Sequence, residues 1–186
     1  SCSKDEDEIL PYPDEDTLHE FKLHSNNRVS SLLMTSSEYN SWLSNDDFSN
    51  GGKRHALFQD IYKKFPDKYD FIFLVLNEPS KPSTPSYYGK LIGVSNDIEG
   101  LGLNAYDNST EYGSSGKLKA VMQLTAIDYL KFGPALHELA HNWANFAITT
   151  HSVDAPGLNL TSYEYLGHWG FTGGSTKGQL GGFKQS

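Results

Sequence analysis

The chain has 186 residues, of which 37% are hydrophobic and 13% aromatic, and its formal net charge is −8. This length suits one domain with a substantial core, and no apolar run reaches the roughly twenty residues of a membrane-spanning helix. Residues 1–16 hold seven acids and one lysine, which leaves sixteen acids and fourteen bases in the remainder. The remainder is close to neutral, which excludes a strongly basic surface, so we expect no nucleic-acid partner.

Residues 1–16 have the composition of a flexible, solvated tether. Cys2 is the only cysteine, so no disulfide can form within the chain. A cysteine followed by an acidic run is similar to the maturation point and surface-export signal of some Gram-negative lipoproteins. We therefore expect a lipid anchor at Cys2, an outer-membrane or cell-surface location, and one domain over residues 17–186. An ordinary free thiol at Cys2 is the alternative.

Hydrophobic patterning and turn residues divide the next part of the chain into predicted elements. In chain order these are a strand within 17–30, a helix near 38–43, a helix over 53–65, and strands at 69–76, 91–95, 101–106 and 118–124. The run YDFIFLVL at 69–76 is apolar almost throughout, which predicts a buried central strand. Together the elements predict an α+β fold, with helices packed on a twisted mixed sheet.

The segment HELAH at residues 137–141 carries the strongest functional signal. Two histidines four residues apart project from the same face of a helix, so His137 and His141 can bind one Zn²⁺. Glu138 between them is then placed to act as a base. Pro134 marks the helix start, and no Gly or Pro follows before residue 147. The pattern therefore predicts a metal-binding helix over about 134–147.

The predicted helix has two faces. At about 100° per residue, His137 and His141 fall opposite an apolar arc. That arc consists of Leu136, Leu139, Ala140, Trp143, Phe146 and Ala147. A helix that binds a metal needs an apolar face that packs in the core and a polar face that lines a cleft. The alternative is a surface helix with exposed histidines, or histidines that are hydrogen-bonded inside a core.

A catalytic zinc site needs a third protein ligand. His168 lies in GHWGF, where the flanking glycines allow the backbone to turn and approach a metal closely. Another known arrangement of zinc ligands has a glutamate on a second helix some twenty residues after the two histidines. Glu164 is the nearest match to that glutamate, but it has no clear helix around it. His151 and Asp154 follow the helix so soon that the chain would have to fold straight back. These three residues remain alternatives to His168.

HELAHNW followed by HWGF resembles a group of bacterial zincin-type metallopeptidases, over roughly residues 69–182. The resemblance implies a zincin-like, metzincin-like catalytic domain that holds one Zn²⁺, with His168 as the third ligand. Two features depart from the metzincin pattern. Alanine stands at position 147, where a third histidine would fall, and Leu180 stands in a turn that would carry methionine.

The resulting expectation is a zinc metalloendopeptidase that acts on extracellular protein or peptide substrates. Zn²⁺ lowers the pKa of its bound water towards about 7, and Glu138 takes the proton as water attacks the peptide carbonyl. Tyr163 or Tyr165 could assist the oxyanion. Two alternatives remain: a non-catalytic zincin-like module that binds glycans or peptides, and a zinc amidase that acts on a non-peptide amide.

Overall fold

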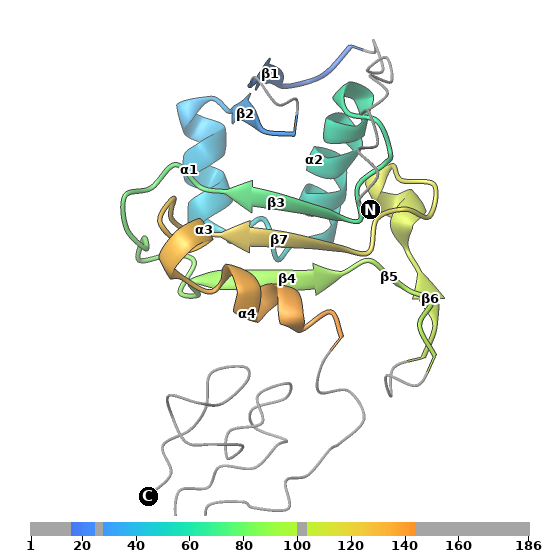
Figure 1. The fold of residues 1–186 in the computed structure, drawn as a ribbon. Helices are drawn as coiled ribbons and strands as arrows, with labels where there is room; N and C mark the ends of the chain where they lie inside the picture. The colour runs from blue at the N-terminus through green and yellow to red at the C-terminus, as the bar shows by residue number, and fades with distance from the viewer. Residues whose placement is uncertain (1–15, 25–27, 100–103, 144–186) are drawn as a thin grey trace, which may run out of the picture. The chain divides into compact units, whose positions relative to one another are not determined.

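The computed structural model describes residues 16–24, 28–99 and 104–143. It combines helices with small sheets, so the α+β class is confirmed (Figure 1). Packing divides the chain into two compact units, residues 1–69 with 109–117 and residues 70–108 with 118–186. Several predictions concern residues outside the described ranges. These are the tether up to residue 15 with Cys2, the ligand candidates His151, Asp154, Glu164 and His168, the tyrosines 163 and 165, and Leu180.

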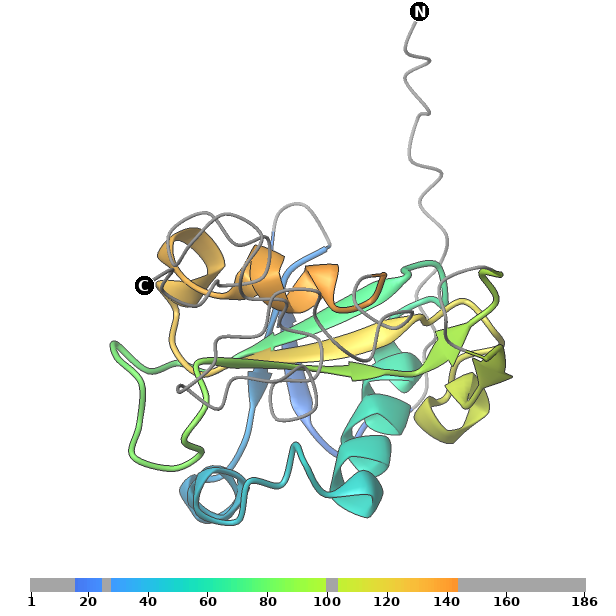
Figure 2. The same ribbon diagram turned by 90° about the horizontal axis from the view of Figure 1, so that it is seen from below.

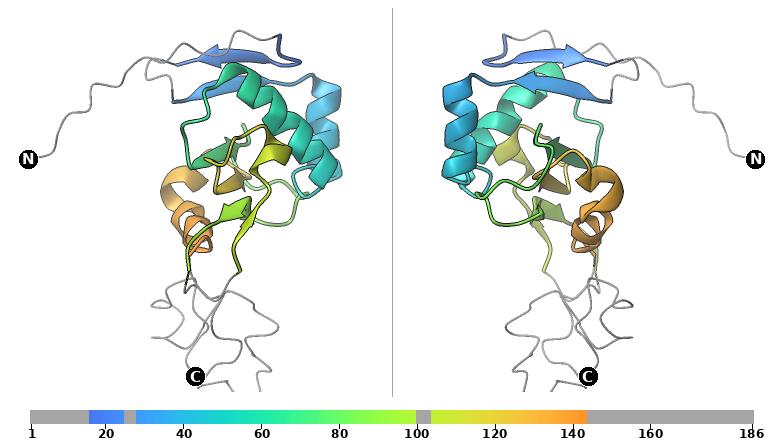
Figure 3. Two further views of the ribbon diagram at one scale, coloured as in Figure 1. Left: turned by 90° about the vertical axis from the view of Figure 1, so that its right-hand side faces the viewer. Right: turned by 90° about the vertical axis from the view of Figure 1, so that its left-hand side faces the viewer.

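The first unit joins a two-stranded antiparallel sheet to two helices and a 3₁₀ turn (Figure 3). Its elements are β1 (Glu20–Leu23), β2 (Ser30–Leu33), α1 (Ser36–Ser44), α2 (Gly51–Lys64) and η1 (Ser109–Tyr112). Both helices begin earlier than predicted because the residue before each one caps it. The Thr35 side chain accepts a hydrogen bond from the Glu38 N–H, and the Asn50 side chain accepts one from the Lys53 N–H.

The second unit contains a three-stranded sheet in the order β3-β7-β4, followed by two short helices. Its elements are β3 (Phe71–Val75), β4 (Gly89–Gly93), β5 (Ser95–Asn96), β6 (Tyr106–Asp107), β7 (Ala120–Leu124), α3 (Tyr129–Phe132) and α4 (Ala135–Ala140). β3 runs parallel to β7 and β4 runs antiparallel to it, so the described sheet is mixed, as predicted. The short strands β5 and β6 form a separate antiparallel pair.

The buried central strand is β7, so the prediction for residues 69–76 is wrong. Every β7 residue is buried, whereas β3 lies at one edge of the described sheet and Phe73 is 37% exposed. The apolar run of β3 is the stronger hydrophobic signal because β7 includes Gln123. That glutamine is buried and donates from Nε2 to the Tyr87 hydroxyl at 2.8 Å, which satisfies a polar group inside the core.

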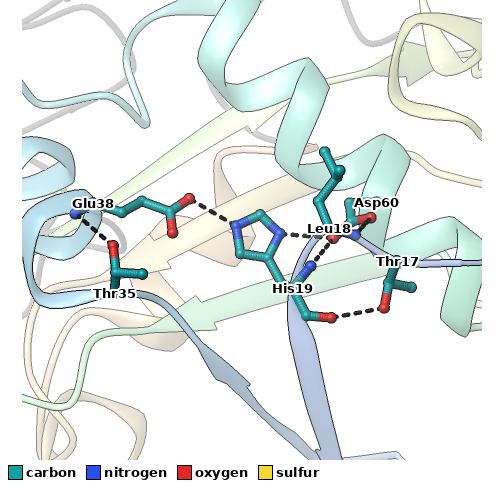
Figure 4. Close-up of polar contacts among 6 residues, drawn as sticks. All are labelled: Thr17, Leu18, His19, Thr35, Glu38 and Asp60. Atoms are coloured by element: carbon teal, nitrogen blue, oxygen red, sulfur yellow. Dashed lines mark hydrogen bonds and ion pairs between the residues drawn. The ribbon is translucent and has the colours of Figure 1, made fainter.

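In the first unit, a histidine between two carboxylates fastens the start of β1 to both helices (Figure 4). Nδ1 of His19 lies 2.7 Å from Oδ2 of Asp60 on α2, and Nε2 lies 2.7 Å from Oε1 of Glu38 on α1. A ring that faces a carboxylate oxygen on each side donates to both only when it is protonated. Asp60 is 1% exposed and also accepts hydrogen bonds from the backbone N–H groups of Leu18 and His19.

The charges of this cluster stabilise one another. Burial alone would lower the pKa of His19, but its contacts with Glu38 and Asp60 outweigh burial and raise the pKa above 6.5. Burial would raise the pKa of Asp60, but hydrogen bonds from Leu18 and His19 lower it below 3.8. Lys63 adds a positive charge, with Nζ 4.0 Å from Oδ1 of Asp60. A raised histidine pKa stabilises the fold until the pH rises through it, and a lowered carboxyl pKa stabilises the fold until the pH falls through it.

We expect His19→Ala to lower the free energy of unfolding by about 3 kcal/mol at mildly acidic pH, because it leaves the buried Asp60 carboxylate without its charged partner. Urea denaturation measures this cost, which should shrink as the pH rises above the raised pKa of His19. His24→Ala is the matched control, since His24 makes an exposed contact with Ser31 and should change stability by less than about 0.5 kcal/mol. An equal cost for His19→Ala at acidic and alkaline pH would contradict the protonated cluster.

Candidate functional site

The helix that carries the HELAH segment is shorter than the sequence predicts. It begins after Pro134, whose carbonyl accepts from the Glu138 N–H at 2.8 Å. After Ala140 the bonds tighten to the i→i−3 type, as in His141 N–H to Glu138 O at 3.1 Å. The turn continues to Trp143, where the described residues end. The prediction of an α-helix over 134–147 is therefore wrong beyond residue 140 in the described part, although both histidines keep the same face.

α4 lies against the sheet of its own unit (Figure 2). Ala135 is buried in one cluster with Met122 and Leu124 of β7, and Leu139 packs on the same cluster. They are four residues apart, so they form one stripe on the helix. Leu136 is 81% exposed, so its predicted place on the buried face is wrong. The buried stripe therefore starts one residue earlier than the sequence predicts.

The last described residue helps to hold the end of this segment. Trp143 lies edge-to-face with Phe71 of β3, with ring centroids 5.5 Å apart and an interplanar angle of 69°. Trp143 is still 43% exposed, so only part of this side chain is covered. Aromatic pairs of this geometry contribute about 0.5–1.5 kcal/mol beyond the area that they bury. The contact places the turn after α4 beside the start of β3.

His137 and His141 converge through their Nε2 atoms. These atoms lie 3.2 Å apart, and the two rings are nearly perpendicular, with an interplanar angle of 83° and centroids 4.9 Å apart. Two nitrogen ligands at about 2.0–2.1 Å from a tetrahedral zinc ion are about 3.3 Å apart. The separation therefore fits two ligands of one Zn²⁺. It also fits a hydrogen bond in which one neutral ring donates to the other.

The described residues supply these two nitrogen ligands and no complete metal site. Within residues 16–24, 28–99 and 104–143, no three or more His, Cys, Asp or Glu side chains gather in a group that could hold a metal ion. All four candidates for the third ligand lie outside those ranges. Zinc binding by His137 and His141 therefore stays a prediction, as does the third ligand.

Glu138 is half-buried where α4 meets β4. Burial raises the pKa of its carboxyl to about 7, against the opposing effect of a hydrogen bond from the backbone of Leu91. A carboxyl of this kind exchanges a proton readily near neutral pH, which is the property that a general base or acid requires. A positive charge close to it would favour the ionised form and lower the pKa.

The Leu91 N–H that reaches Glu138 belongs to the outer edge of β4. Hydrogen bonds pair Tyr88 with Thr125 and Val94 with Lys119, three residues either side of Leu91. Antiparallel pairs alternate between hydrogen-bonded and non-hydrogen-bonded positions, and Leu91 lies opposite Met122 at a position of the second kind. Its N–H therefore points away from β7. Among the described strands β4 is an edge strand, and this is the edge that meets α4.

Sequence reasoning placed the two histidines and Glu138 together but missed the part of β4 that contacts them. The strand predicted at 91–95 is observed at Gly89–Gly93. Glycine inside a strand often marks the close approach of another backbone or side chain, and Gly89 is the residue that could have pointed to this contact. The sequence alone does not assign this role to Gly89, because it does not show that α4 lies beside β4.

Comparison with protein-family models, with curated proteins and with solved structures finds no match to the chain. Across the described ranges, no helix has the length and apolar character needed to cross a bilayer.

Two leucines of α4 provide a matched test of how the helix is held. We expect Leu139→Ala to lower the free energy of unfolding by about 2 kcal/mol, because it leaves space against Met122 and Leu124. Leu136→Ala should change it by less than about 0.5 kcal/mol, since that side chain is 81% exposed. Urea denaturation measures both variants. A larger loss for Leu136→Ala would show that the apolar face predicted from the sequence is the buried one after all.

Proposed function

We propose that the protein is a zinc-dependent hydrolase of peptide bonds. The observation that carries the proposal is the 3.2 Å separation of the His137 and His141 Nε2 atoms on the helix that also bears Glu138. The donor set of two imidazoles fits a zinc ion, and Glu138 lies between them in the sequence, half-buried where α4 meets β4. A binding module would need no such acid between its metal ligands.

When bound, Zn²⁺ supplies Lewis-acid polarisation of the substrate carbonyl and makes water more acidic. Glu138 takes a proton from the attacking water as the new C–O bond forms at the carbonyl carbon. Glu138 then returns that proton to the leaving amine as the C–N bond breaks. Among the described strands β4 is an edge strand, and a peptide substrate fits such an edge because an extended chain can pair with the part of it that Glu138 does not occupy. The proposed fold remains the zincin-like, metzincin-like one that the sequence resemblance implies.

The metal prediction concerns the ligand set. We expect the purified protein to bind one Zn²⁺, and His137→Ala, His141→Ala and His168→Ala each to weaken binding by far more than 100-fold. That exceeds the tenfold to hundredfold loss typical of residues that only orient a ligand. Competition with a chromophoric chelator measures affinity, and elemental analysis measures stoichiometry.

His24→Ala is the histidine control and should retain the parent affinity, whereas loss of affinity in His151→Ala would make His151 the third ligand in place of His168. Circular dichroism shows whether each variant is folded. If His168→Ala keeps full affinity while Glu164→Ala or Asp154→Ala loses it, the third ligand has been assigned wrongly. Unchanged affinity in His137→Ala and His141→Ala would remove the zinc site altogether.

The catalytic prediction separates metal binding from chemistry. Glu138→Gln should keep zinc and fold, because the amide is nearly the same size and the residue is not a ligand. It should reduce peptide hydrolysis by about 10²–10⁴-fold, since an amide cannot accept the proton of water. Cleavage of a mixed peptide library, with a chelator-treated sample as the control, measures this effect.

Undiminished cleavage by the Glu138→Gln variant would remove Glu138 from the proposed role. If the zinc-loaded parent cleaves no peptide, two further assays distinguish the alternative functions. Hydrolysis of non-peptide amides would assign an amidase, and retention of glycans or peptides without turnover would assign a binding module.

A further inference from the structure

Gly89 lies where the backbone of β4 comes close to the side chain of Glu138. A Cβ atom at this position would stand 2.8 Å from Cγ of Glu138, 2.9 Å from Cγ of Pro134 and 3.1 Å from Cδ2 of Leu124. Carbon atoms in contact are normally about 3.5–4.0 Å apart, so a side chain here would push at least one of these groups away. The space beside Gly89 is therefore filled by Glu138 and Pro134 at the helix and by Leu124 of β7.

The same strand holds the far end of the Glu138 side chain. Leu91 is two residues after Gly89, so both residues are on one face of β4. Leu91 packs against the core cluster, and a Cβ at Gly89 would meet Glu138 and Pro134, which identifies that face as the one towards the helix. The Leu91 N–H is hydrogen-bonded to the Glu138 carboxyl group. Close approach at Gly89 and the hydrogen bond at Leu91 therefore act on one side chain, at its stem and at its tip.

We propose that Gly89 is a positioning residue for Glu138. Its missing side chain lets β4 come near enough to α4 for the Leu91 N–H to fix the carboxyl group, so the base is held before any substrate arrives. The catalytic meaning of this inference rests on the proposed function. The placement of Glu138 does not, and it can be measured in a protein without any hydrolysis assay.

Gly89→Ala in the full chain is the first test, read by the amide proton shift of Leu91 and by the Tm. Loss of a hydrogen bond to a carboxylate moves an amide proton upfield, so Gly89→Ala should shift the Leu91 signal in the same direction as Glu138→Ala. The added methyl group should lower the Tm by about 5 °C, and by about half as much in the Glu138→Ala background, where Cγ is gone. Gly52→Ala is the control, because a Cβ there meets only Asn50 Oδ1 at 3.6 Å.

A Leu91 amide signal unchanged in Gly89→Ala, or a Tm loss of the same size with and without Glu138, overturns the proposal. Activity then tests its catalytic meaning. Displacement of the base should lower kcat by about 10- to 100-fold while KM and zinc content stay at the parent values. In the Glu138→Gln background the same substitution should cause no further fall in kcat. A parent without hydrolysis would end the proposed function, while the amide shift and the Tm cycle would still decide the role of Gly89.

Discussion

The packing of α4 on β7 is the contact on which the candidate site depends. Ala135 and Leu139 cover Met122 and Leu124, and this short stripe holds a helix of only six residues that could not persist alone in water. Because His137 and Glu138 lie between the two packed residues in the sequence, their directions follow from that stripe. The orientation of the polar face is therefore a consequence of apolar burial on the other side of the same turn.

Two acids in the described part of the chain, Asp60 and Glu138, have pKa values shifted in opposite directions. Asp60 is almost completely buried yet has a lowered pKa, because backbone N–H groups and a protonated histidine surround it. Glu138 has a raised pKa, because burial among the surrounding groups raises it and a single backbone hydrogen bond offsets little of that effect. Asp60 has more donors around its carboxyl group, which outweigh the effect of burial. The lowered pKa of Asp60 keeps its carboxylate charged, which suits a structural role. The raised pKa of Glu138 allows its carboxyl group to gain and lose a proton near neutral pH.

Local sequence patterns predict some features of the fold and of the candidate site but not others. The spacing of His137 and His141 placed both rings on one face, because four residues in a helical turn fix that geometry wherever the helix lies. The capping residues before α1 and α2 also act locally, and both helices appear near their predicted positions. The buried strand was misjudged because apolar content reports how much a strand could bury, whereas its place in the sheet depends on its neighbours. The contacts of His19, Gly89 and Leu91 join segments far apart in sequence, so no local pattern predicts them.

One feature of β4 also affects how the protein behaves in a concentrated solution. An exposed strand edge offers unpaired N–H and C=O groups to other chains, and such edges are common starting points for aggregation. Here the edge is five residues long, ends in glycine at both sides, and has the N–H of its middle residue engaged by an acid from the neighbouring helix. A second copy of the chain would have to displace Glu138 before its own strand could pair along the whole edge. Glu138 therefore occupies the middle of the described edge, where a pairing strand would need the N–H of Leu91.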